Sequence, residues 1–295
     1  MTLLKPLTTS LSIQLLLLGI TLLSGCSMGK IVARSSTSIL DGGVDAMNRE
    51  TDLLLAEQAI PANIKLMEGL ITEDPDNQDL RVYTAQAFYG YAYGFVELAD
   101  SERAKALYQR GFDHAGKALQ RWHITDELLQ GDPDKLHQAV SKLNKSAVPA
   151  LFWAASNWAK RIDLDRTNPT SIAELASTEI LMRQVLKLQP DYYYGGASLF
   201  YGVYYGSRAP MFGGDFTRAD ANFSAARKVS NNRLLLIDVL QAEYLERQRF
   251  DQAKFHQLLT EVANTPQGHF PEMALANQIA RARARYLLIK EEEWF

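Results

Sequence analysis

The chain of 295 residues lacks most of the features that catalysis or metal binding requires. It has a single cysteine, Cys26, which excludes an intramolecular disulfide and any CxxC metal or redox site. No GxSxG elbow, Walker loop or GxGxxG motif is present. The histidines are scattered and never adopt HExxH or i, i+4 spacing: His114, His123, His137, His256 and His269. We therefore predict a protein that is not an enzyme and that uses no cofactor or metal.

Basic residues are slightly fewer than acidic ones. The chain has 31 Lys and Arg against 34 Asp and Glu, a net charge of −3, and no run of basic residues. Because binding to a phosphate backbone depends on a basic patch, a nucleic-acid partner is not expected.

Two groups of charged residues invite a chemical interpretation. Asp163 and Asp165 could serve as an acid and a base, but Arg161 and Arg166 flank them, which favours surface ion pairs. The second group alternates around one terminal helix and so predicts a solvated helix; it consists of Arg281, Arg283, Arg285, Glu291, Glu292 and Glu293.

The N-terminus carries the pattern of a signal peptide for lipoproteins. Lys5 is followed by an apolar run, LSIQLLLLGITLL at 11–23, and Ser24 and Gly25 lead into Cys26. A membrane-spanning helix needs about 20 apolar residues, and this run has 13. We predict cleavage before Cys26 and lipidation of that cysteine. Ser27 after the cysteine favours the outer membrane, with the protein facing the periplasm.

Composition divides the chain into three parts. Residues 1–25 are the predicted signal peptide, and residues 26–43, which include the serine-rich stretch SMGKIVARSSTSI at 27–39, are predicted to be a lipidated tether. Residues 44–295 read as one all-helical domain, because apolar residues recur at intervals of three and four and no sustained alternation occurs.

The helices repeat in the manner of tetratricopeptide hairpins. A bulky residue on one helix is followed nine positions later by a small residue on the next in three pairs: Leu53 and Ala62, Phe95 and Ala104, and Tyr244 and Ala253. Helix ends are predicted before Pro75, Pro190 and Pro266, since proline cannot continue a helix. The fold class is therefore all-α, a tetratricopeptide-like array of helical hairpins (an α-solenoid).

One repeat departs from this spacing. Gly202 and Tyr205 match the small and aromatic positions of a first helix, and Ala219 and Phe223 match those of a second, but Tyr205 and Ala219 are 14 residues apart. The inserted loop is GSRAPMFGGD at 206–215, and a second long connection covers 162–170. Such insertions often lie on the binding face of a solenoid, although a surface loop without a function explains them equally well.

Aromatic residues are concentrated in three helical segments. They are Phe88 to Phe95, Phe152 to Trp158, and Tyr192 to Tyr205, the last leading directly into the inserted loop. Stripes of this kind commonly form core, yet three glycine-interrupted examples favour an aromatic-lined groove or pore, in which Arg208 would meet an anionic group. The candidate residues for ligand or partner binding are Trp153, Trp158, Arg161, Tyr193, Tyr201, Tyr204, Tyr205, Arg208, Met211, Phe212 and Asp215.

At these motifs the sequence resembles a known family, the T-component lipoproteins of tripartite ATP-independent periplasmic (TRAP) transporters. The resemblance rests on the LSGC motif at 23–26 and on four further segments: FYGYAYGFVE at 88–97, RAKALYQRG at 103–111, ALFWAASNW at 150–158 and YYYGGASLFYGVYYGSRAPMFGGDFTRADANFSAA at 192–226. It covers essentially the whole chain after Cys26.

The resemblance implies a lipid-anchored periplasmic protein that self-associates as a homotrimer and docks the solute-binding (P) protein of a TRAP transporter. It also implies clefts or pores that pass a ligand to or from the solute-binding protein. From the aromatic helices and the Arg-containing loop, we expect that ligand to be an organic carboxylate, including a hydrophobic one. A different class remains open: a tetratricopeptide lipoprotein that serves as a scaffold for outer-membrane protein assembly and binds no small molecule.

Overall fold

The computed structural model describes residues 28–35 and 37–295, so Cys26 and the predicted signal peptide lie outside the described residues. Within this part of the chain no strand is present, which confirms the all-helical prediction. The principal helices are α2 (Met28–Ser35), α3 (Thr37–Asn48), α4 (Leu53–Glu73), α5 (Gln78–Tyr91), α6 (Ser101–Leu119), α8 (Pro133–Val140), α9 (Val148–Asp163), α11 (Leu175–Leu188), α12 (Tyr192–Gly206), α13 (Phe216–Val229), α14 (Leu236–Gln241), α15 (Gln252–Asn264) and α16 (Ala274–Ile289).

Shorter elements connect these helices. Two single π-helical turns, η1 (Ala92–Val96) and η5 (Ala242–Glu246), extend α5 and α14. The others are η2 (Gln120–Trp122), α7 (Asp126–Leu129), η3 (Lys145–Ala147), α10 (Pro169–Ala173), η4 (Pro210–Phe212), η6 (Pro271–Met273) and α17 (Glu291–Trp294). No helix in the described ranges is long and apolar enough to cross a membrane.

Helix ends follow local sequence signals. The side chains of Asp52, Asn77, Asp100 and Asp251 accept hydrogen bonds from backbone N–H groups of the helices that follow them, which satisfies donors that a helix N-terminus leaves free. Helices α4, α11 and α15 end at or next to the residue predicted from the proline that follows. One predicted pair is wrong, because Leu53 and Ala62 both lie in α4, which continues through Pro61.

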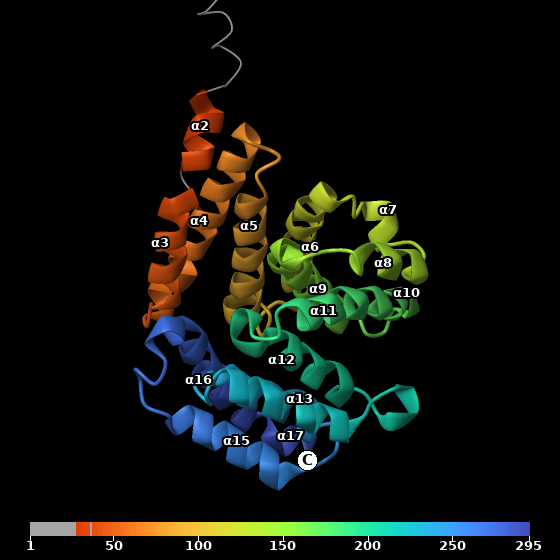
Figure 1. The fold of residues 1–295 in the computed structure, drawn as a ribbon. Coiled ribbons are helices and arrows are strands. Elements are labelled where there is room, and N and C mark those ends of the chain that lie inside the picture. Colours follow the sequence, from red (N-terminus) through yellow and green to blue (C-terminus); the bar gives the residue numbers. More distant parts are fainter. Residues whose placement is uncertain (1–27, 36) are drawn as a thin grey trace, which may run out of the picture.

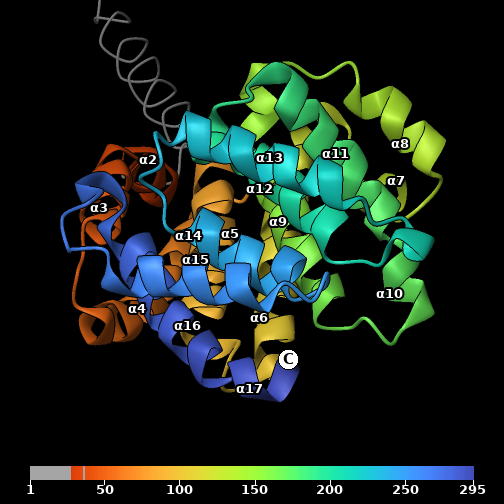
Figure 2. The ribbon, with the colours of Figure 1, turned by 90° about the horizontal axis from the view of Figure 1, so that it is seen from below.

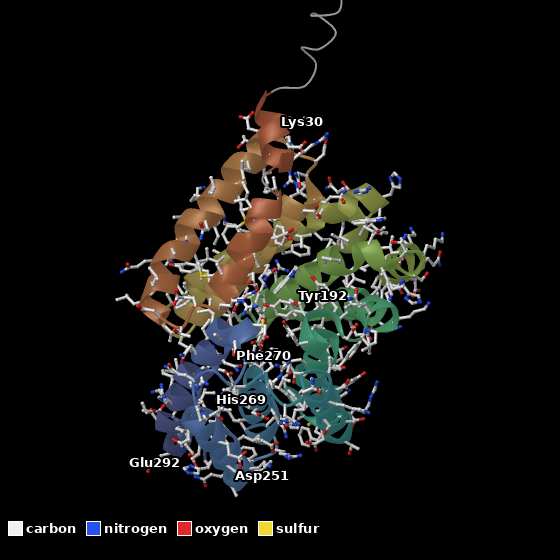
Figure 3. The ribbon with its side chains drawn as sticks, turned by 60° about the vertical axis from the view of Figure 1, so that its left-hand side comes forward. Lys30, Tyr192, Asp251, His269, Phe270 and Glu292 are labelled. Atoms are coloured by element: carbon white, nitrogen blue, oxygen red, sulfur yellow. The ribbon has the colours of Figure 1, made fainter. Side chains whose placement is uncertain are left out.

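The helices form a curved array that closes on itself. Neighbours pack in sequence order, α4 on α5, α5 on α6, α6 on α9, α9 on α11 and α12 on α13, while α15 packs on α16. At the end of the array α16 returns to α3 and α4, so the C-terminal helices lie against the N-terminal ones (Figures 1 and 2). Phe270, 2% exposed, lies at this junction (Figure 3). The centre of the array is therefore enclosed by helices from both halves of the chain.

The predicted tether is helical where the structure describes it. Helices α2 and α3 replace most of the unstructured segment expected up to residue 43. Ala33 is fully buried in a small cluster with Ile71 and Leu80, so α2 packs on the start of the array. The serine-rich composition concealed this buried apolar position.

The inserted loop is ordered by its Gly-Gly-Asp sequence. Gly213 has a φ of +84°, a left-handed conformation that favours glycine. A Cβ on Gly214 would overlap the backbone carbonyl of Arg208. Asp215 then caps α13, because its carboxylate accepts the Arg218 N–H at 2.9 Å. The motif thus explains how the loop reaches α13.

Candidate functional site

The centre of the array contains an apolar cavity of about 400 Å³. Its wall is built by α3, α4, α5, α9, α12, α14 and α16, so it depends on the closure of the array. Cavities of this size and character are typical of small-molecule sites. Among the lining residues are Tyr89, Tyr93, Phe152, Trp153, Tyr193, Leu199, Phe200 and Tyr204.

The aromatic segments meet at this cavity rather than in separate cores. The ring of Tyr89 lies 6.3 Å from that of Tyr93 and 5.5 Å from that of Trp153. The rings of Trp153 and Tyr193 are 4.9 Å apart in a T-shaped arrangement. Edge-to-face and offset contacts of this kind are the favourable ones between aromatic rings. The cavity wall is therefore a continuous aromatic surface from α5, α9 and the start of α12.

The first turn of α12 has an unusual backbone. Tyr193 and Tyr194 have φ values of +47° and +58°, in the left-handed region that bulky residues rarely adopt. The ring of Tyr193 is held between Phe152, at 5.6 Å, and Trp153. Strained backbone of this kind often occurs at functional sites, and here it turns Tyr193 toward the cavity wall.

Of the residues predicted from sequence, four line the cavity: Trp153, Tyr193, Tyr204 and Arg208. Arg208 donates from Nε and Nη2 to the carbonyl oxygen of Tyr204, at 3.2 and 2.9 Å, and its guanidinium lies 4.1 Å from the centre of the Tyr204 ring. No carboxylate among the described residues forms an ion pair with it. Arg208 therefore brings a positive charge without a compensating acid to an apolar cavity.

Trp158 and Arg161 lie away from the cavity lining. Both bind Glu174: the indole Nε1 donates to its carboxylate at 2.6 Å, and the Arg161 guanidinium pairs with the same oxygen. Arg161 also donates to Gln109 at 2.9 Å, and the Trp158 ring packs 4.6 Å from that of Phe112. These contacts tie α9 to its neighbours.

Tyr201 and Tyr205 are also outside the lining. The Tyr201 hydroxyl donates to the Glu179 carboxylate at 2.8 Å, and burial together with that carboxylate raises its pKa. The Tyr205 ring carries the Arg218 guanidinium at 3.9 Å. Both tyrosines hold α12 against neighbouring helices.

The tip of the inserted loop faces solvent. Met211 and Phe212 are 83% and 70% exposed, and Asp215 is the helix cap described above. Within the loop, only Ser207 and Arg208 contribute to the cavity.

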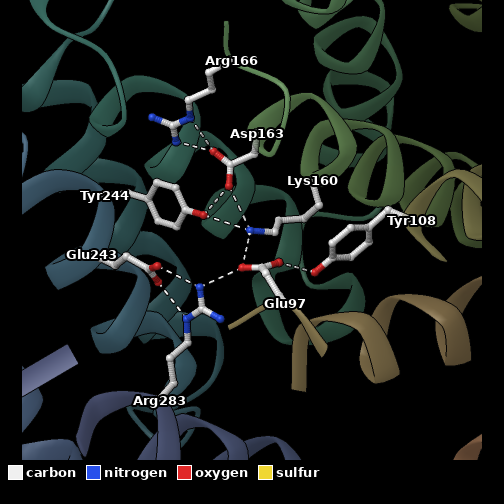
Figure 4. Close-up of polar contacts among 8 residues, drawn as sticks. All are labelled: Glu97, Tyr108, Lys160, Asp163, Arg166, Glu243, Tyr244 and Arg283. Atoms are coloured by element: carbon white, nitrogen blue, oxygen red, sulfur yellow. Dashed lines mark hydrogen bonds and ion pairs between the residues drawn. The ribbon is translucent and has the colours of Figure 1, made fainter. Parts of the chain in front are cut away.

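A cluster of charged residues, largely buried except for Arg166, lines part of the cavity, and the sequence analysis did not identify it (Figure 4). At its centre the Lys160 ammonium donates to Asp163 at 2.9 Å, to Glu97 at 3.0 Å and to the Tyr244 hydroxyl at 3.0 Å. An ammonium group has three N–H donors, so all of those on Lys160 are in use.

The cluster extends outward from Lys160 on both sides. Arg283 donates to Glu97 at 2.8 Å and to Glu243 at 2.8 Å. On the other side Arg166 pairs with Asp163, with its Nε at 2.8 Å. The Tyr108 hydroxyl completes the set by donating to Glu97 at 2.5 Å. Three acids thus balance three bases.

In this cluster, pairing between opposite charges affects the pKa values more than burial does. Burial alone would raise the pKa of Asp163 and Glu97, but Lys160 and the adjacent arginines lower both pKa values. Burial would lower the pKa of Lys160, yet the carboxylates of Asp163 and Glu97 hold that pKa well above its ordinary range. All three side chains are therefore ionised at neutral pH.

One prediction about charged residues is confirmed and another is wrong. Asp163 pairs with the exposed Arg166, as expected, although it also belongs to the cluster, and Asp165 bonds to Lys105, Asn168 and Ser171. Arg281 and Arg283 were assigned to a solvated helix, but they are 4% and 3% exposed. The spacing of Lys160, Asp163 and Arg166 at intervals of three was the local signal for the cluster. Glu97, Glu243 and Arg283 gave none, because they are distant in sequence.

A second, polar pocket of about 710 Å³ lies on the other side of the cluster. Asp163, Arg166, Ser207 and Tyr244 line both this outer pocket and the apolar cavity. Glu243, Arg247 and Arg283 line the outer pocket only. The charged cluster is therefore a layer between two spaces of opposite character.

Comparison with known proteins identifies a family and a relative. The family model described as "TRAP transporter T-component" matches residues 49–295. A relative described as "Uncharacterized protein" from Treponema pallidum (strain Nichols) is 23% identical over 309 residues, which cover 93% of this chain and 94% of the relative.

Proposed function

From the membership of this chain in the TRAP transporter T-component family, we propose that it binds an organic carboxylate with an apolar body in its central cavity and docks the solute-binding protein of the transporter. The family consists of transport components rather than enzymes, which agrees with the absence of catalytic motifs from the sequence. The observation that carries the ligand proposal is an apolar cavity with one uncompensated cation, Arg208, in its wall.

Arg208 is the best-suited of the three cationic lining residues. Lys160 has already committed its three donors, and Arg166 is paired with Asp163. Arg208 is bonded only to a neutral carbonyl and stacked on Tyr204. A guanidinium in this state keeps donors for a carboxylate and matches its planar geometry. The apolar body of the ligand would then lie along the aromatic wall.

Ligand binding is tested with decanoate and its neutral analogue decanol. We expect decanoate to bind about tenfold more tightly, a difference of about 1.4 kcal/mol, and we expect Arg208→Gln to abolish that difference while leaving decanol binding unchanged. Arg218→Gln is the matched control, because Arg218 stacks on the neighbouring Tyr205 outside the lining. Equal binding of both compounds by the unmodified chain would refute the proposal that Arg208 recognises the carboxylate.

The partner and the anchor need separate tests. Affinity purification from crosslinked envelopes should recover the solute-binding protein; recovery of outer-membrane assembly proteins with no ligand would favour the scaffold function instead.

Lipidation of Cys26 predicts that the chain incorporates labelled palmitate and that the variant Cys26→Ser does not. Fractionation on a sucrose gradient should place the protein in the outer membrane, and crosslinking should yield a homotrimer.

A further inference from the structure

Three members of the charged cluster, Asp163, Arg166 and Tyr244, line both the apolar cavity and the outer pocket, as does Ser207. Tyr244 is the cluster's central contact across the two spaces: its hydroxyl donates to Asp163 at 2.5 Å and accepts from Lys160 at 3.0 Å. Loss of the Tyr244 hydroxyl would remove these two contacts and leave the salt bridges of Glu97 with Lys160 and Arg283 in place.

The closed cluster leaves polar atoms unsatisfied at its margin. The hydroxyl of Tyr93 and the Nη1 of Arg283 are buried and have no hydrogen-bond partner. The two side chains are adjacent, with the Arg283 guanidinium 4.4 Å from the centre of the Tyr93 ring. A buried donor without a partner carries a desolvation penalty. Opening the cluster to water or to a ligand would remove that penalty, which lowers the free energy of the open state.

The backbone at the cluster is irregular in two places. Glu97 directly follows the π-helical turn η1, and Glu243 and Tyr244 lie within the π-helical turn η5. Single π-helical turns within α-helices are rare and frequently mark functional sites. Both turns deliver their polar side chains to the same cluster, from segments far apart in the chain (Figure 4).

We propose that the cluster is an openable partition, that Tyr244 is its latch, and that a carboxylate bound in the apolar cavity leaves through it into the outer pocket. The inference rests on the proposed function for the chemistry of the ligand. It adds an exit route for that ligand and assigns the cluster as the barrier on that route. On the outer side the ligand meets Arg283 and Arg247, which line that pocket.

The test compares two tyrosines that each give one hydroxyl to the cluster. Tyr244 lines both spaces, whereas Tyr108 is fully buried and lines neither. Dissociation of isotope-labelled decanoate is measured by NMR exchange in the full chain. We expect Tyr244→Phe to raise the dissociation rate about fivefold, equivalent to about 1 kcal/mol, and Tyr108→Phe to leave it unchanged.

The route is tested by blocking the outer pocket. In a full-length Cys26→Ser, Tyr244→Phe chain, a bulky maleimide on Leu98→Cys, an exposed residue of the pocket lining, should cancel the acceleration. The same label on Lys187→Cys, exposed at the end of α11, should not. Acceleration that survives the Leu98 label, or that Tyr108→Phe reproduces, would overturn the partition and leave ligand binding standing. Absence of decanoate binding by the unmodified chain would overturn both proposals.

Discussion

The wall of the apolar cavity and the charged cluster are stabilised in different ways. The wall consists of many aromatic and aliphatic contacts, each of which contributes a small part of the energy. The cluster joins six charged side chains through a few hydrogen bonds, so each buried charge depends on its partners in the cluster. The wall makes few specific polar contacts, which suits ligands of different shape. The cluster depends on specific hydrogen bonds, which suits a barrier that opens when one of them is lost.

The largest effect should come from removing the central cation of the cluster. Lys160→Met leaves Glu97 and Asp163 buried without their shared partner, and we expect a loss of about 3–5 kcal/mol in the free energy of unfolding. In the wall, Leu199→Met conserves volume and should cost less than about 1.5 kcal/mol. Denaturant unfolding followed by circular dichroism measures both. Similar losses would remove the distinction between the two regions.

Acid should weaken the cluster and not the wall. The pKa values of Asp163 and Glu97 are lowered in the folded chain, so their stabilisation is present above the unfolded pKa values of about 4 and is lost as pH falls through the folded values. The loss should not exceed about 1.4 kcal/mol per pH unit for each carboxylate. Thermal unfolding below pH 5 should have a shallower pH dependence in Asp163→Asn. An unchanged dependence would mean that Asp163 does not contribute.

Two glycines differ in the space that surrounds them. A Cβ on Gly202 would lie 2.9 Å from the fully buried ring of Phe223, so Gly202→Ala should cost about 1–3 kcal/mol. Gly90 lines the cavity and has no neighbour within 4 Å of a built Cβ. Gly90→Ala should therefore stabilise the chain by about 0.5–1 kcal/mol through helix propensity. Calorimetry decides, and destabilisation of equal size in both variants would contradict the packing described.

The smallest effect is expected at the tip of the inserted loop. Because Met211 and Phe212 are largely exposed, replacing both with serine should change the free energy of unfolding by no more than about 0.5 kcal/mol and leave decanoate affinity unchanged. A measurable loss of affinity by calorimetric titration would show that the loop folds over the cavity.

Sequence patterns predicted the wall better than the cluster. Trp153, Tyr193, Tyr204 and Arg208 could be identified because aromatic runs and an inserted loop are visible along the chain. Trp158, Tyr201 and Tyr205 share the same runs but point toward neighbouring helices, and only tertiary packing distinguishes them. Glu97 and Arg283 are 186 residues apart, and closure of the array brings them together. No local pattern encodes that contact.

The most direct test of the account is a crystal structure of the chain with decanoate that carries a terminal bromine. We predict anomalous scattering from bromine within the apolar cavity and the carboxylate within hydrogen-bond distance of Arg208. Bromine located only outside the cavity, or a carboxylate bound away from Arg208, would contradict the proposal that this cavity is an anion-reading ligand site.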